Sequence, residues 1–255
     1  MAQGENYFKQ AVALAKSIKK TQSGVNLVAV ITDQLTTDDA IDYQIDIGDD
    51  LAENSNWKIE NRCKFYKLSP FDETVILDSD MLFLDDVSHW WEYLSKFEML
   101  CTSKVKTYRN EWVQTSPYRK TFVSNELPNV YSAFTYFKKC ETSKIVFDLV
   151  TSIVSNWDEW TRRYAKENRQ PFPSIDLALA IAIKVLGIED RVINDMDFPT
   201  FTHMKSGCQG WKTYNEDWRT HIGVYSSEQG IRLGNHLQSG ILHYVDKNFL
   251  QELEK

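Results

Sequence analysis

One stretch decides the fold of this chain: Thr74-Val75-Ile76-Leu77-Asp78-Ser79-Asp80-Met81-Leu82-Phe83-Leu84-Asp85-Asp86. Its apolar start, residues 74–77, predicts a buried parallel strand. Asp78 and Asp80 follow directly, and residues two apart on a strand point the same way. Ligands of an open α/β sheet bind outside the carboxyl ends of its strands. We therefore expect both carboxylates at the rim of a cleft.

Two carboxylates on one side are typical ligands of a hard divalent cation such as Mn²⁺ or Mg²⁺, which completes its shell with substrate phosphates. The alternative is a solvated acidic loop after a strand. Apolar residues resume at once in residues 81–84, which places Asp78 and Asp80 inside the structure. An unpaired charge is costly there, so this context favours a functional site.

The segment from Val75 to Phe83 resembles the Asp-x-Asp strand of GT-A nucleotide-sugar glycosyltransferases. It is most similar to the glycogenin-like and galactosyltransferase-like group (glycosyltransferase family 8) and to bacteriophage glycosyltransferase-type proteins. The resemblance implies the α/β GT-A fold, with a mixed, mostly parallel sheet flanked by helices. It also implies that Asp78 and Asp80 hold Mn²⁺ or Mg²⁺, and that the metal holds the diphosphate of a UDP-sugar. Residues 86–94 resemble the family's short helix after this motif.

Length and composition favour one soluble α/β domain, residues 1–255. The chain has 255 residues, of which 42% are hydrophobic, and it has no visible repeat or linker. No stretch approaches the ~18 apolar residues of a membrane span, and no signal peptide is recognisable. The net charge of −7 argues against nucleic acid as the main partner. Four scattered cysteines without a Cys-x-x-Cys pair make a reduced, cytoplasmic setting the default expectation.

The start of the chain predicts an incomplete βαβ unit. Residues 5–20 have the apolar stripe of an amphipathic helix, and residues 26–33 read as a buried strand. The strand before this helix would precede Gln3, which leaves only Met1 and Ala2 for it. We therefore expect a truncated first strand, and we expect apolar residues added before Met1 to raise the melting temperature. Residues 38–50 are acidic and predicted to be irregular.

Two residues upstream of the metal motif are candidates for donor binding. Asp33 ends the strand of residues 26–33 and could contact the base or ribose, or simply cap the strand end. Residues 55–68 predict a helix that carries Arg62, sixteen residues before Asp78. In the glycogenin-like group a basic residue at that separation contacts the donor, which implies that role for Arg62. The alternative is a solvated or ion-paired arginine.

The middle of the chain predicts core elements and a polar loop. Strands are expected at residues 98–102 and 129–138, and a helix at residues 143–166. Residues 104–130 are rich in polar and aromatic side chains, as in lids and acceptor grooves, although an ordinary packed loop is equally compatible. The strand of residues 129–138 resembles the family's Asn-x-Gly strand, but Tyr131 and Ala133 replace its two residues, so that sugar contact is not transferred.

A well-capped helix is predicted at residues 175–186, with Ser174 as N-cap and Gly187 as terminator. Asp176 lies in its first turn, where a carboxylate interacts favourably with the helix dipole. The family has an Asp-Gln-Asp at this place, and its last Asp binds the donor sugar near the reacting carbon. The resemblance therefore implies a catalytic role for Asp176.

The C-terminal part contains two apolar runs that end near a histidine, at His203 and at His243. The run before His243 resembles the family's C-terminal strand, whose His is the third metal ligand. This implies that His243 completes the metal site, and that Lys247 contacts the diphosphate. A neutral imidazole is a good Mn²⁺ ligand. The competitor for the third ligand is His203, and the alternative for either ring is a packed histidine.

These features together predict a metal-dependent glycosyltransferase that transfers a sugar from a nucleotide-sugar to an acceptor hydroxyl, with retention if the glycogenin-like resemblance extends to mechanism. One alternative is a non-catalytic sugar-nucleotide or glycan-binding protein. Another is a haloacid-dehalogenase-like phosphohydrolase, in which the first Asp of an Asp-x-Asp is the nucleophile. That class carries the motif on its first strand, whereas here a strand and two helices precede it. The sequence identifies neither the sugar nor the acceptor.

Overall fold

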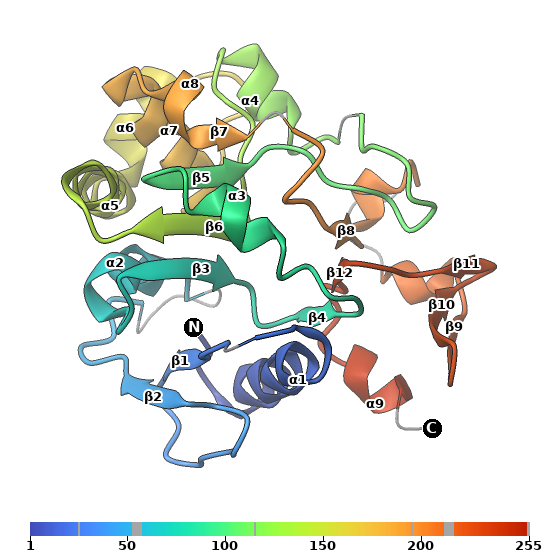
Figure 1. The fold of residues 1–255 in the computed structure, drawn as a ribbon. Helices are drawn as coiled ribbons and strands as arrows, with labels where there is room; N and C mark the ends of the chain where they lie inside the picture. The colour runs from blue at the N-terminus through green and yellow to red at the C-terminus, as the bar shows by residue number, and fades with distance from the viewer. Residues whose placement is uncertain (25, 53–57, 115, 195, 212–216, 254–255) are drawn as a thin grey trace.

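The computed structural model describes residues 1–255 except 25, 53–57, 115, 195, 212–216 and 254–255 (Figure 1). The α-helices are α1 Glu5–Thr21, α2 Phe65–Leu68, α3 Trp90–Leu94, α4 Lys120–Ser124, α5 Glu141–Ser155, α6 Trp157–Tyr164, α7 Ile175–Leu186, α8 Glu189–Val192 and α9 Phe249–Leu253. The 3₁₀ helices are η1 Ile59–Lys64, η2 Ser206–Cys208 and η3 Trp218–Thr220. The strands are β1 Ala29–Thr32, β2 Tyr43–Asp46, β3 Glu73–Leu77, β4 Met81–Phe83, β5 Met99–Thr102, β6 Tyr131–Lys138, β7 Ile193–Asn194, β8 Thr202–His203, β9 Val224–Ser227, β10 Gly230–Leu233, β11 His236–Leu237 and β12 Ile241–His243.

A four-stranded sheet in the order β3-β6-β5-β7 forms the centre of the molecule. One hydrophobic cluster joins it to α5 and α7, and Val146, Val150 and Ile181 are among its fully buried members. A second cluster covers other side chains of the same sheet with α1 and α3, where Trp90 packs edge-on against Phe134. Helices therefore flank this sheet, as predicted (Figure 1).

A second sheet, in the order β4-β12-β8, connects the segment after the metal motif to the C-terminal part of the chain. Strand β12 runs antiparallel to β4, with His243 opposite Met81. It runs parallel to β8, with His243 opposite His203. Residues more than 150 positions apart are thereby held side by side.

The prediction of a parallel strand at residues 74–77 is wrong in its direction. Strand β3 forms at this place, but it pairs antiparallel with β6. Apolar composition indicates burial and does not report strand direction, which depends on partners distant in the sequence. Among the described pairings, antiparallel ones outnumber parallel ones, so the sheets are mixed without the expected predominance of parallel pairs.

The N-terminal elements follow the prediction with one addition. Helix α1 forms as expected, and β1 occupies part of the predicted strand. Strand β2, within the acidic segment predicted to be irregular, pairs parallel with β1. The expected first strand is reduced to a single parallel bridge between Ala2 and Thr32, where the Ala2 amide donates to the Ile31 carbonyl at 2.8 Å.

Three predicted helices are tested by the structure. The helix at residues 175–186 is confirmed as α7: Ser174 accepts a hydrogen bond from the Leu177 amide, and Gly187 adopts a left-handed conformation. The predicted helix 143–166 is interrupted at Asn156, whose non-helical backbone separates α5 from α6. The predicted helix 55–68 is a 3₁₀ helix followed by one α-helical turn in its described part, and residues 53–57 lie outside the described residues.

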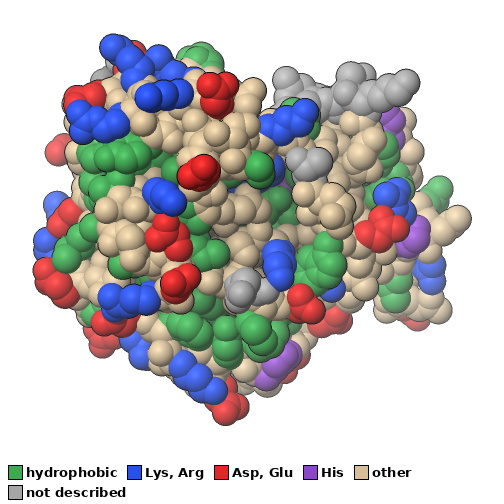
Figure 2. Space-filling view, turned by 90° about the horizontal axis from the view of Figure 1, so that it is seen from above, with side chains coloured by type: hydrophobic (Ala, Val, Ile, Leu, Met, Phe, Trp, Pro, Cys, Tyr) green, Lys and Arg blue, Asp and Glu red, His purple; other side chains and the backbone are tan. Residues whose placement is uncertain are grey.

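The described part of one face carries charges of both signs (Figure 2). Figure 2 shows acidic and basic side chains interspersed over the described part of one face, rather than the continuous basic face that binds nucleic acid. All four cysteines are free thiols. Within the described residues, every helix is too short or too polar to cross a bilayer.

Candidate functional site

A cavity of about 920 Å³ collects most of the residues predicted from the sequence. Its wall includes the metal motif after β3, the N-terminus of α7, the end of β12 and the segment that follows β12. The volume is near the upper end of the range for small-molecule sites. The cavity therefore has room for a ligand larger than a monosaccharide.

Asp78, Asp80 and His243 converge on one wall of this cavity. Each offers one potential ligand atom, and the three atoms lie within 4.8 Å of one another. The Nε2 atom of His243 is 3.1 Å from Oδ1 of Asp80 and 3.8 Å from Oδ2 of Asp78. The pairing of β4 with β12 explains the convergence, since the Tyr244 amide donates to the Asp80 carbonyl at 3.0 Å and fixes this register.

His203 lies behind His243 rather than beside the carboxylates. The two rings face each other through their Nδ1 atoms at 3.1 Å. Burial and the neighbouring His243 hold the pKa of His203 well below its ordinary value, so its ring is neutral. Nδ1 of a neutral His203 can accept a hydrogen bond from Nδ1–H of His243, and Nε2 of His243 is then directed at Asp80. The geometry thus favours His243 over His203 as the residue that joins the two aspartates.

Arg62 from η1 reaches the same wall and pairs with Asp78, with 2.9 Å between Nη1 and Oδ1. The side chain of Asp78 is 16% exposed, so its charge is partly desolvated and needs a partner. The sequence predicted Arg62 near the donor, and the structure places it against the metal motif.

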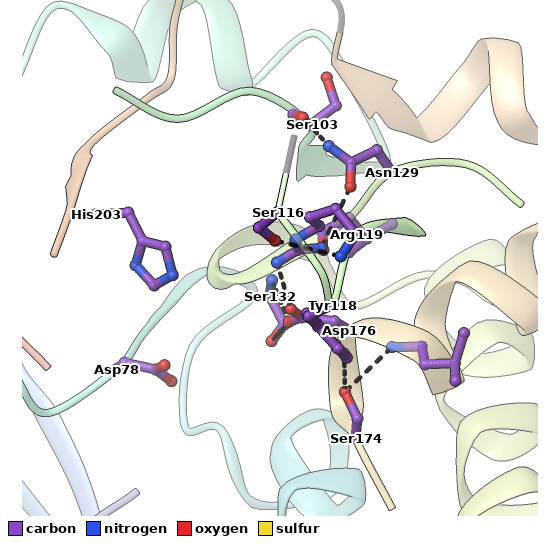
Figure 3. Close-up of polar contacts among 12 residues, drawn as sticks. Asp78, Ser103, Ser116, Tyr118, Arg119, Asn129, Ser132, Ser174, Asp176 and His203 are labelled. Atoms are coloured by element: carbon purple, nitrogen blue, oxygen red, sulfur yellow. Dashed lines mark hydrogen bonds and ion pairs between the residues drawn. The ribbon is translucent and has the colours of Figure 1, made fainter. Parts of the chain in front are cut away.

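Asp176, at the first turn of α7, belongs to a second polar network in the wall of the cavity (Figure 3). One carboxylate oxygen accepts from the Ser132 amide at 2.9 Å, and the other accepts from Nη2 of Arg119 at 2.7 Å. Burial alone would raise the pKa of Asp176, but Arg119 and the Ser132 hydrogen bonds outweigh it and lower that pKa. Asp176 is therefore held as an anion.

Arg119 is a site residue that the sequence did not single out. It is 6% exposed, lies between Asn129 and Asp176 in Figure 3, and places its guanidinium 3.5 Å from the ring centroid of Tyr131. The sequence offered little to distinguish Arg119, because it is one of several polar residues in the loop of residues 104–130. At Arg119, this loop forms part of the cavity wall and packs against the core.

Of the two remaining predicted site residues, Lys247 lines the cavity and Asp33 does not. Lys247 lines the cavity, with its Nζ atom 5.2 Å from the ring centroid of Tyr7. Asp33 is not among the residues that line it, and its carboxylate accepts from the Gly4 amide at 2.9 Å. The geometry of Asp33 thus matches the alternative in which it caps neighbouring backbone.

The cavity wall also carries cationic side chains for which the sequence predicted no role, Arg219 among them. Arg219, within η3, contacts Asp217 and Asp246, each at 2.7 Å. These residues lie in a loop-rich part of the sequence with no periodic pattern, so only the folded chain brings them to the cavity.

The contacts of His243 with Asp78 and Asp80 predict that the unfolding free energy depends on pH. Burial alone would lower the pKa of His243, but Asp80 and Asp78 outweigh it and raise the pKa above the ordinary value of 6.5. A raised pKa stabilises the fold below the unfolded value, and this stability is lost as the pH rises through the folded-state value. We expect the metal-free protein to lose unfolding free energy above about pH 6.5, and His243→Gln to reduce that loss. Urea denaturation across this range, with exposed His89→Gln as control, tests it; an identical slope in both variants would contradict it.

Comparison with known proteins concerns the fold. No family model and no curated protein matches the sequence. Among solved structures, mouse xyloside xylosyltransferase 1 in its apo form superposes with a TM-score of 0.54 at 8% identity, covering 95% of each chain. The galactosyltransferase LgtC, in complex with donor and acceptor sugar analogues, superposes with a TM-score of 0.53 at 12% identity, covering 96% of this chain and 85% of that one.

The chain has the GT-A fold. The predicted fold class is thereby confirmed. At these identities the likeness concerns the fold alone, so the role of each residue in this GT-A chain follows from its surroundings.

The three potential metal ligands, Asp78, Asp80 and His243, are of the types that bind a divalent cation. Two carboxylates and one imidazole are suitable ligands for Mn²⁺, and carboxylates are also suitable for Mg²⁺. Their oxygen and nitrogen atoms already lie within 4.8 Å of one another. They face a cavity in which a diphosphate could supply the remaining ligands.

Proposed function

We propose that this protein is a metal-dependent glycosyltransferase whose donor is a UDP-linked sugar. The observation that carries the proposal is the convergence of Asp78, Asp80 and His243 on one wall of a 920 Å³ cavity in a chain with the GT-A fold. We propose these three as ligands of Mn²⁺ or Mg²⁺. The metal, when bound, would neutralise charge on the diphosphate.

The other residues of the cavity have separate proposed roles. The acceptor hydroxyl attacks the anomeric carbon, the bond from that carbon to the diphosphate breaks, and the hydroxyl proton is released. Arg62 and Lys247 stabilise negative charge on the departing diphosphate. Asp176 stays anionic beside the reacting carbon and orients the sugar, since Arg119 and Ser132 hold its carboxylate in place. Asp33 has no proposed donor contact in this arrangement.

Further details of the proposal rest on the resemblance of residues 75–83 to the Asp-x-Asp strand of GT-A glycosyltransferases. We propose a single domain over residues 1–255, a cytoplasmic location, a place near the glycogenin-like or bacteriophage group, and transfer with retention of configuration. The configuration of the product, read by NMR of the anomeric proton, tests retention. The proposed partners are the nucleotide-sugar and an acceptor that bears a free hydroxyl, such as a glycan, a protein or a small molecule.

A second candidate function is a sugar-nucleotide-binding protein without catalysis. One observation favours it: Tyr131 stands where the resembling strand has Asn, and its ring stacks against Arg119. Tyr131 lines the cavity, so this wall carries an aromatic ring in place of an amide. The phosphohydrolase alternative gains no support from the site, and we do not propose it.

A thermal-shift screen of nucleotide-sugars, with and without Mn²⁺, tests the proposal. A ligand that binds only the folded protein at about 100 times its Kd stabilises it by about 2.7 kcal/mol, which corresponds to a rise in Tm of about 5–10 °C. We expect this rise for a UDP-sugar with Mn²⁺ and a much smaller one without the metal. No shift with any nucleotide-sugar contradicts both candidates.

Turnover then separates the two candidates. A glycosyltransferase slowly hydrolyses its donor in the absence of an acceptor, because water can replace the acceptor hydroxyl. Release of UDP from the stabilising donor supports the transferase. Binding without release over many hours supports the non-catalytic alternative.

A further inference from the structure

The 920 Å³ cavity also carries a second group of side chains, Tyr118, Phe172 and Lys205, which have no role in the donor contacts proposed above. Tyr118 connects the other two. Its hydroxyl forms a hydrogen bond with that of Ser174, two residues after Phe172 (Figure 3). The Nζ atom of Lys205 lies 5.7 Å from the centroid of the Tyr118 ring. These side chains therefore lie along one part of the cavity wall, close to the start of α7.

Phe172 combines high exposure with a place in the cavity wall. Its side chain is 68% exposed, and a proline stands on either side of it. The ends of this short segment are fixed, because the Gln170 carbonyl accepts from Nε1 of Trp157 at 2.9 Å and Ser174 caps α7. An aromatic ring on such a fixed segment can receive the apolar face of a sugar ring with little loss of conformational freedom.

Lys205 differs from the arginines of the cavity wall in its surroundings. Each arginine pairs with a carboxylate: Arg62 with Asp78, Arg119 with Asp176, and Arg219 with Asp217. Among the described residues, Lys205 forms no ion pair with a carboxylate. Its charge nevertheless acts near the proposed reacting centre. Burial raises the pKa of Asp176, Arg119 opposes this most strongly, and Lys205 adds to the lowering. A partly buried ammonium group in this position favours an anionic partner.

The donor already has a proposed lysine partner elsewhere in the cavity. Lys247, the proposed contact of the diphosphate, lies over the ring of Tyr7 in α1. Lys205 instead lies over Tyr118, whose hydroxyl reaches the N-cap of α7. The two lysines therefore have different surroundings, and Lys205 remains for a second substrate.

We propose that Tyr118, Phe172 and Lys205 form the acceptor subsite, and that the acceptor is a sugar that carries an anionic group, either a carboxylate or a phosphate. The apolar face of the sugar ring would pack on Phe172, and the anionic group would bind the ammonium group of Lys205. This inference rests on the proposed function, because it assigns the donor to the remainder of the same cavity.

Ligand-observed NMR titration tests the subsite with methyl glycosides of glucose, galactose and mannose, each as the neutral sugar, the 6-phosphate and the uronate. The full chain is titrated alone and with UDP and Mg²⁺, since Mn²⁺ broadens the signals. We expect at least one charged sugar to bind about tenfold or more tightly than its neutral counterpart. An advantage of the 6-phosphates or of the uronates identifies the anion.

Three variants separate charge from packing. Lys205→Met keeps most of the side-chain length and removes the charge, so the preference for charged sugars should fall to about twofold or less. Phe172→Ala removes a ring that contacts every sugar, so charged and neutral sugars should weaken by a similar factor, about fivefold. The matched control is Lys120→Met, an exposed lysine of α4 that does not line the cavity, and it should retain the full preference.

Any of three results would overturn the proposal. The charged sugars could bind no more tightly than their neutral counterparts. Lys205→Met could keep the preference of the wild type. It could also weaken UDP binding in Mg²⁺ as much as it weakens the charged sugar, which would assign Lys205 to the donor. Failure of the proposed function is seen separately, as a lack of UDP binding, because the titrations without nucleotide do not depend on it.

Discussion

Replacement of Asp80 by Asn is expected to lower the Mn²⁺-dependent affinity for UDP by at least about 100-fold, because a ligand is lost and even outer-shell changes cost about 10–100-fold. Asn keeps the shape of the side chain and a hydrogen bond to His243, whose Nε2 is 3.1 Å from the carboxylate. The fold should therefore survive. Asp78→Asn is expected to act in the same direction, and it also deprives Arg62 of its ionic partner. Titration calorimetry with and without Mn²⁺ measures both variants.

The matched control is Asp72→Asn, which changes an exposed carboxylate directly before the first residue of β3. It alters net charge by the same amount and leaves the cavity untouched, so its affinity for UDP should equal that of the wild type. Unchanged Mn²⁺-dependent affinity in both Asp78→Asn and Asp80→Asn would remove the metal assignment. A loss that is equal with and without Mn²⁺ would instead indicate a structural role for the carboxylates.

The sequence predicted the parts of this site that depend on local signals. Asp78 and Asp80 follow an apolar run, and Ser174 and Gly187 delimit α7, so the position of Asp176 followed from capping rules. The position of His243 came from a resemblance in the order of motifs along the chain. The structure then supplied its physical basis, since β12 pairs with β4 directly after the aspartates.

Non-local features could not be predicted in the same way. The direction of β3 depends on β6, more than fifty residues later, and a run of apolar side chains is compatible with either direction. Strand β2 lies in an acidic segment, where its pairing with β1 overrides weak propensity. Arg119 has no local pattern, because its partners Asp176 and Val130 meet it only in the folded chain.

Removing one partner of the buried pair of Arg119 and Asp176 is expected to destabilise the protein more than removing one partner of an exposed pair among the described residues. Their side chains are 8% and 18% exposed, and removal of one partner leaves the other charge desolvated. Breaking such a pair typically costs about 3–5 kcal/mol, which for a chain of this size lowers Tm by about 10 °C. We expect this loss for Arg119→Met, which keeps much of the volume and removes the charge.

A double-mutant cycle separates charge from packing. Asp176→Asn in the Arg119→Met background removes the orphaned charge and should recover part of the lost Tm. The matched control is Lys144→Met in the exposed pair with Asp148, where water and salt screen the charges and the loss of Tm should be much smaller. Equal small losses at both pairs would show that the Arg119 pair is energetically like a surface pair.

The same pair predicts a dependence on acid. Because Arg119 and Ser132 lower the pKa of Asp176 below its ordinary value of 3.8, the stability from this carboxylate is present above that value and is lost as the pH falls through the folded-state pKa. The difference in unfolding free energy between the wild type and Arg119→Met should therefore narrow in acid, while it stays constant near neutral pH. A difference that is independent of pH down to acid unfolding would assign the effect of Arg119 to its stacking on Tyr131 rather than to its charge.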